Sequence, residues 1–141
     1  MTEPSTSRNP AADPAARGRT TIADGVVVKI AGMAAGEVDG VHALGGGLAR
    51  TVGAVRDRVP GGRSSVTRGV KVEVGERQSA IDLELVVEYG LPILDVAGAV
   101  RENVIAAVER MTGLEVVEVN IAVSDVHLPE DDDEESEGRV R

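Results

Sequence analysis

The stretch "AIDLELVVEYGLPILDVAGAV", residues 80–100, changes its hydrophobic period halfway along. Up to Val87 the apolar residues fall at every second position, which is typical of a strand with one buried face. After Pro92 they fall at every third or fourth position, which is typical of an amphipathic helix. The sequence therefore predicts a strand that passes into a helix within a few residues, in a segment without His, Cys, Ser or Lys.

The same two periods divide the rest of the chain. Strands are expected at 19–24, 41–44, 70–74, 81–88 and 115–126, and helices at 25–40, 48–59 and 96–112. The last strand is expected to point Val117, Val119, Ile121 and Val123 inward. This order, β-α-β-α-β-β-α-β, predicts an α+β fold: a small mixed sheet of about five strands with helices packed mainly on one face.

The two ends of the chain differ in composition from the part between them. Residues 1–19 contain three of the six prolines and lack apolar periodicity, which indicates a disordered N-terminal arm. Residues 129–141 carry seven acidic residues and two arginines, which indicates an acidic disordered tail. One domain, residues 20–128, is left to form the core.

Composition excludes several classes of function. The chain has no cysteine, so disulfides and thiolate metal sites are absent. Its net charge of −9 argues against general binding to a phosphate backbone, and Tyr89, the single aromatic residue, gives nucleic acid no stacking platform. No signal peptide or run of about 20 apolar residues is visible. We therefore expect a cytoplasmic protein.

Few residues suggest chemistry. The carboxylates Asp82, Glu84 and Glu88 line one strand face and suggest either a metal-dependent hydrolase or an ordinary solvated face. His42 and His127, the only histidines, are expected at strand ends, and their spacing supplies no third metal ligand. The sequence predicts no enzyme, no catalytic residue, no cofactor and no metal site.

Two surfaces are candidates for binding a partner. The span 50–71 is locally basic and suits the chain's own acidic tail, an acidic partner or anionic headgroups, or it is a solvated face. The first helix carries apolar residues outside its main stripe, which suggests either a protein interface or burial on two sides. The candidate residues are Val28, Met33, Ala35, Arg50, Arg56, Arg58, Arg63, Arg68 and Lys71.

Four segments resemble the bacterial alkaline-shock, envelope-stress-response proteins. They are "IADGVVVKIAGMAAGEVDGVHAL" (22–44), "GVKVEV" (69–74), "IDLELVVEYGLPI" (81–93) and "RMTGLEVVEVNIAVSDV" (110–126). The resemblance implies a non-enzymatic scaffold or adaptor that self-associates and is recruited to the membrane by an integral membrane partner. It implies a location in the cytoplasm or at the inner face of the cell membrane.

The alternative function is a nucleic-acid-binding α+β module that uses the basic segment 50–71. A steep dependence of binding on salt would distinguish it from a protein scaffold, because each phosphate contact releases counterions. The resemblance carries no catalytic residues to this chain.

Overall fold

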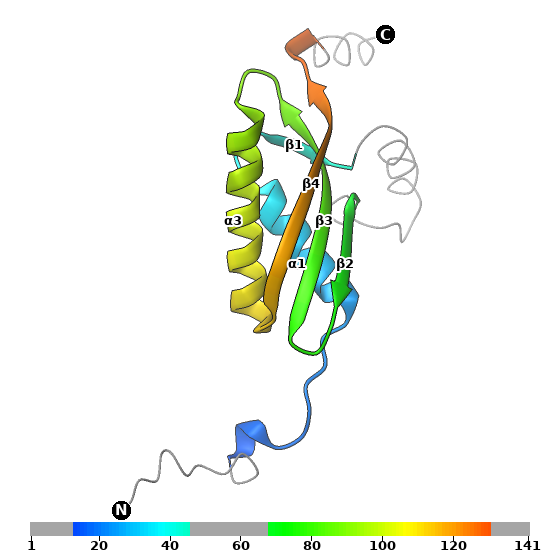
Figure 1. The fold of residues 1–141 in the computed structure, drawn as a ribbon, viewed down its shortest axis with the longest axis vertical. Coiled ribbons are helices and arrows are strands. Elements are labelled where there is room, and N and C mark those ends of the chain that lie inside the picture. Colours follow the sequence, from blue (N-terminus) through cyan, green and yellow to red (C-terminus); the bar gives the residue numbers. More distant parts are fainter. Residues whose placement is uncertain (1–12, 46–67, 131–141) are drawn as a thin grey trace, which may run out of the picture.

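Figure 1 shows the computed structural model, which describes residues 13–45 and 68–130. The described residues form a short 3-10 helix, η2 (Pro14–Ala16), the helices α1 (Asp24–Gly36) and α3 (Ile93–Thr112), and the strands β1 (Val41–Leu44), β2 (Val70–Val74), β3 (Gln78–Glu88) and β4 (Glu115–His127). The two longer helices pack against each other and against one face of the sheet. The predicted α+β class is therefore confirmed.

Strand β3 is the middle of the sheet. β4 pairs with it in parallel along its whole length, from Gln78 opposite Glu115 to Glu88 opposite His127. β1 and β2 both pair antiparallel with the other edge of β3, so the sheet is mixed. The helix α3 makes the crossover that two parallel neighbours require.

Two glycines mark the place where β1 and β2 meet along this edge. The amide of Gly45 donates to the carbonyl of Glu84 at 2.6 Å, and the amide of Glu84 donates to the carbonyl of Gly69 at 2.8 Å. Both glycines have positive φ, 78° and 72°, and a Cβ on Gly69 would overlap the backbone of Gly45. β1 and β2 thus act as one edge strand that is split by residues 46–67.

The core lies between the sheet and the two helices and is aliphatic. Its fully buried members come from alternate positions of β3 and from one face of each helix, and they include Val27, Ala31, Ile81, Leu85, Val100, Val104 and Val108. Burying one such Val, Ile or Leu side chain contributes about 1.5–3 kcal/mol. The helix α3 ends at Gly113, as the sequence predicts, because this residue takes a left-handed conformation with φ of 76°.

Two side chains of α3 bond to the backbone of β4. Arg101 Nε donates to the carbonyl of Val119 at 3.1 Å, and the amide of Val116 donates to the Glu109 carboxylate at 3.0 Å. In the part of the chain that the structure describes, β4 has only β3 as a partner strand. The two side chains therefore occupy backbone groups of an edge strand, which are otherwise open to pairing with another chain.

The predicted strand at 19–24 is wrong. Residues 19–23 are irregular, and Asp24 is the first residue of α1. Within 19–23 only Ile22 packs against the core, so the segment buries too little to be held as a strand. The described sheet has four strands instead of about five, and the predicted helix at 48–59 lies outside the described residues.

The predicted inward face of the last strand is wrong at one position. Val116 is opposite Ser79 and Glu118 is opposite Ala80, so Val117 is the extra residue of a β-bulge. As a result Val116 is buried and Val117 is 51% exposed. Beyond the bulge the alternation is as expected, because Val119 and Ile121 pair with the core residues Ile81 and Leu83.

Candidate functional site

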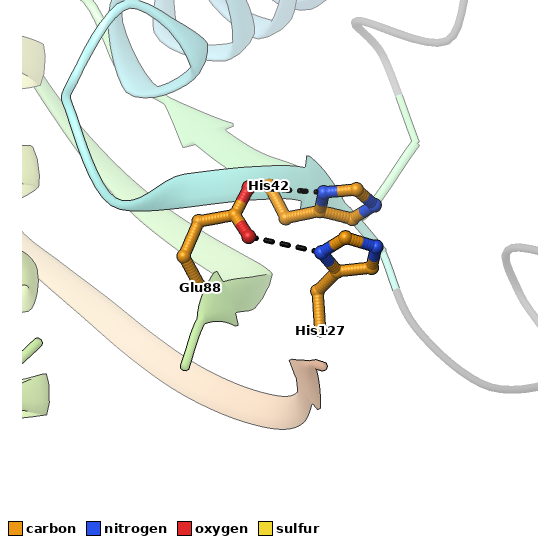
Figure 2. Close-up of side chains that lie close together, drawn as sticks. All are labelled: His42, Glu88 and His127. Carbon is orange, nitrogen blue, oxygen red and sulfur yellow. Dashed lines mark hydrogen bonds and ion pairs between the residues drawn. The ribbon is translucent and has the colours of Figure 1, made fainter. Parts of the chain in front are cut away.

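Three strands bring His42, Glu88 and His127 together at one end of the sheet (Figure 2). Glu88 and His127 are the last residues of β3 and β4 and are direct neighbours in the parallel register. His42 lies at the register irregularity between Val41 and Ala43 of β1. We call these three residues the histidine cluster.

Glu88 bridges the two histidines. Its Oε1 lies 2.9 Å from Nδ1 of His127, and its Oε2 lies 3.1 Å from Nδ1 of His42. The two imidazole rings are stacked, with centroids 3.7 Å apart and planes inclined by 6°. The Nδ1 atoms of His42 and His127 therefore face the Glu88 carboxylate from the same side, as Figure 2 shows.

The hydrogen bond from His127 is the main reason why the pKa of Glu88 lies below its ordinary value. Partial burial opposes this shift, and the contact with His42 adds to it. An ionised carboxylate only accepts hydrogen bonds, so each Nδ1 carries a proton while both bonds are formed. The cluster is partly open to solvent, because the side chains of His127, His42 and Glu88 are 11%, 30% and 42% exposed.

The face of the sheet away from the helices is acidic. The register of the strands places these residues on it: Lys71, Glu73, Asp82, Glu84, Glu118 and Asp125. Asn120 donates to Asp82 and to Glu118, both at 3.0 Å, which holds two of these carboxylates along the sheet. The histidine cluster lies at the end of this acidic face.

The three carboxylates that the sequence grouped together do not form one site. Asp82 bonds to Asn120 on β4, whereas Glu88 faces the two histidines at the strand end. Among the described residues, the histidine cluster is the single group of three or more His, Cys, Asp or Glu residues that is close enough to hold a metal ion. The spacing of the two histidines does not reveal this cluster, because the parallel pairing of β3 with β4 supplies the third ligand.

The structure places only some of the predicted partner-binding residues. Met33 is 57% exposed and Lys71 is exposed, whereas Val28 is half-buried against the core. Ala35 is fully buried in the core, which at this position agrees with the alternative of a helix buried on two sides. Arg68 is half-buried. The remaining candidates, Arg50, Arg56, Arg58 and Arg63, lie outside the described residues.

Four exposed apolar residues lie in the turn between β3 and α3 and at the start of α3. Leu94 is 84% exposed, Tyr89 69%, Leu91 46% and Ile93 42%. We call this segment the 89–94 turn. It adjoins the histidine cluster, because the amide of Tyr89 donates to the carbonyl of His127 at 3.1 Å. In the sequence this segment is marked only as the passage from a strand to a helix.

A search of the described helices for a membrane span finds none that is both long and apolar enough.

Comparison with known proteins identifies the family. Residues 12–128 match the model of the alkaline-shock protein 23 family, described as having a cell envelope-related function. The chain is 38% identical over 116 residues to the "Stress response regulator gls24 homolog" of Streptococcus pyogenes serotype M1, a match that covers 82% of this chain and 63% of that protein. It is also 38% identical over 106 residues to the "Uncharacterized protein YqhY" of Bacillus subtilis strain 168, with 75% of each chain covered.

No solved structure matches the chain. The chain spans less than two thirds of the length of the streptococcal relatives, since the match covers 63% of them. The family match extends over nearly all of the described residues, which includes both helices and all four strands. The chain therefore belongs to the alkaline-shock protein 23 family of cell envelope-related proteins, and the resemblance seen in its sequence is confirmed.

Proposed function

We propose that this chain is a non-enzymatic scaffold or adaptor of the cell-envelope stress response, that it self-associates, and that an integral membrane protein recruits it to the membrane. The description of the family and the name of the streptococcal relatives support the cellular role. The observation that carries the docking role is the exposed 89–94 turn.

The 89–94 turn has the properties of a contact surface. Burying one exposed leucine such as Leu94 in an interface contributes about 1.5–3 kcal/mol. Two backbone hydrogen bonds of 3.1 Å hold the turn in place, one from Tyr89 to His127 and one from Val96 to Pro92. A surface that is already ordered loses little conformational entropy when a partner binds.

We assign the turn to contact between copies of the chain. Met111 and Val117, which are 63% and 51% exposed, lie at the opposite end of α3 and at the start of β4. Exposed apolar residues thus lie at each end of the long helix α3. When one end of a copy packs against the opposite end of the next copy, each contact covers one surface of each kind, and a ring or filament of copies covers both.

Light scattering of the full chain tests this assignment. The wild-type chain is expected to form oligomers and the Leu94→Asp variant to be monomeric. The variant keeps its fold, because an acidic residue in the first turn of α3 interacts favourably with the helix dipole. Met33→Asp on α1 is the matched control, since Met33 is also exposed, and it is expected to leave the oligomer intact.

Two outcomes would contradict the assignment. A wild-type chain that stays monomeric at high concentration excludes self-association. Oligomers that survive Leu94→Asp but dissociate with Met33→Asp would move the contact to the surface of α1.

Fractionation of cells that make the chain tests recruitment to the membrane. Because the proposed anchor is a protein embedded in the bilayer, the chain is expected to sediment with membranes and to be released by detergent. Recovery of all the chain in the supernatant, with and without crosslinking, would contradict recruitment to the membrane.

The described residues do not favour the alternative of nucleic-acid binding. Of the basic segment 50–71, the structure describes only 68–71. Lys71 lies opposite Asp82 on a face that also carries Glu73 and Glu84. Such a face repels phosphate groups.

A further inference from the structure

We propose that His42, Glu88 and His127 form a binding site for one divalent transition-metal ion, with zinc as the best fit. The sequence predicts no metal site, and the proposal departs from that prediction because the fold supplies a third ligand beside the two histidines. It goes beyond the scaffold function and does not depend on it.

The donor set selects the class of ion. Two imidazole nitrogens and one carboxylate oxygen are ligands that zinc takes together, with a fourth position left to water or to a further ligand. Magnesium and calcium prefer sites made only of oxygen atoms. The cluster therefore suits zinc or a neighbouring first-row transition-metal ion better than it suits magnesium or calcium.

The distances in the cluster are close to those of an occupied site. One ligand atom from each of His42, Glu88 and His127 lies within 4.8 Å of the other two. A tetrahedral zinc ion with ligands at about 2.0–2.2 Å separates neighbouring ligand atoms by roughly 3.3–3.6 Å. The present Nδ1 to oxygen distances of 2.9 and 3.1 Å need to lengthen by only a few tenths of an ångström.

The rings also need to turn. Stacked imidazoles point their Nδ1 lone pairs in nearly the same direction, so at least one ring rotates for both to reach one ion. The side chains of His42 and Glu88 have room for this movement, because they are 30% and 42% exposed. A neutral imidazole that binds through Nδ1 carries its single ring proton on Nε2, so the proton now on each Nδ1 moves to Nε2 when the ion binds.

The backbone fixes the three ligands relative to one another. Glu88 and His127 are paired across β3 and β4, and the amide of Glu88 donates to the carbonyl of Gly40 at 2.9 Å, next to β1. Ligands on paired strands are held more firmly than ligands on loops, and this lowers the entropy that binding an ion costs. The acidic face of the sheet adds an electrostatic attraction for cations.

The experiment is a calorimetric titration of the full chain with zinc chloride, followed by NMR of the imidazole nitrogens. We expect one ion per chain and a shift of the Nδ1 resonances of both histidines. Glu88→Gln is nearly isosteric and is expected to weaken binding by about 10-fold or more. The paired His42→Ala and His127→Ala variant is expected to abolish it.

Glu84→Gln is the matched control, because it removes a carboxylate from the same strand and the same face without touching the cluster. It is expected to leave affinity within about 2-fold, since a single exposed charge contributes little to local attraction.

Three results would overturn the proposal. One is no heat and no imidazole shift at millimolar zinc. Another is binding that survives loss of both histidines, which would assign the ion to carboxylates elsewhere in the chain. The third is equal weakening by Glu84→Gln and Glu88→Gln, which would reduce the effect to general attraction by the acidic face. The imidazole shifts are measured on the wild-type chain, so they test zinc binding by the two histidines even where a variant fails to fold.

Discussion

Asn103 of α3 donates a hydrogen bond of 2.7 Å from its side-chain amide to the backbone carbonyl of Ala34, in the last turn of α1. The last carbonyls of a helix lack partners within that helix, so a neighbouring helix here satisfies one of them. Ala34 is buried, which makes water a poor substitute. This contact links two packed helices that are far apart in the sequence.

Asn103→Ala is expected to destabilise the fold by about 1–3 kcal/mol, the cost of leaving a buried acceptor unsatisfied. Urea unfolding followed by circular dichroism measures the loss. Glu37→Gln is the control, because its contact with Asn103 is exposed and 3.4 Å long. If both variants unfold at the wild-type midpoint, the bond between Asn103 and Ala34 does not hold the helices together.

Gly69→Ala and Gly98→Ala are expected to change the stability of the fold in opposite directions. A methyl group on Gly69 overlaps the backbone of Gly45 at a positive φ, so we expect a loss of at least about 1–3 kcal/mol. Gly98 lies inside α3 with open space around its Cβ position, and alanine there is expected to stabilise by about 1 kcal/mol. Thermal midpoints of the two variants compare them directly, and a neutral Gly69→Ala would contradict the close approach.

Arg101→Ala together with Glu109→Ala is expected to speed aggregation. The double variant frees the carbonyl of Val119 and the amide of Val116 on β4, which has no second partner strand among the described residues. Exposed edge strands pair with other chains. Thioflavin fluorescence and turbidity under stirring measure the rate.

Glu102→Ala on the same helix serves as the control for that experiment, since its side chain is exposed and bonds to no β4 backbone group in the described structure. Equal rates for Glu102→Ala and the double variant would show that the bonds from α3 do not protect the edge.

The lowered pKa of Glu88 predicts a contribution to acid stability. The folded pKa lies below the ordinary value of 4.5, so the stabilising contribution of Glu88 is present above that value and is lost as pH falls through the folded pKa. Glu88→Gln is therefore expected to be less stable than wild type at neutral pH, with a difference that shrinks in acid. Urea midpoints across this range, measured without metal, test it, and a difference that grows in acid would reverse the sign.

The sequence was most informative where one period of hydrophobicity ran uninterrupted. The alternation at 81–88 predicted β3, and the helical spacing after Pro92 predicted α3 and its end at Gly113. Both elements can be predicted locally, because the spacing of apolar residues within a strand or a helix determines which of its faces is buried.

The parts that the sequence did not predict depend on register between distant segments. Val117 leaves the core because a bulge adds one residue to β4, and no local pattern marks that position. Glu88 meets His127 because two strands joined through a helix end level with each other. The parallel pairing of β3 with β4 could be predicted, since a strand–helix–strand unit favours it. The alignment of their last residues, Glu88 and His127, could not be predicted from the sequence.

The close approach of Gly45 to Gly69 also bears on the length of the connection between them. Both ends of the segment 46–67 are anchored beside the same residue, Glu84, so the sheet already brings them together. The entropy of closing a loop rises only slowly with its length, by about 0.6 kcal/mol for each doubling. The connection between these two glycines can therefore change in length at little entropic cost to the domain.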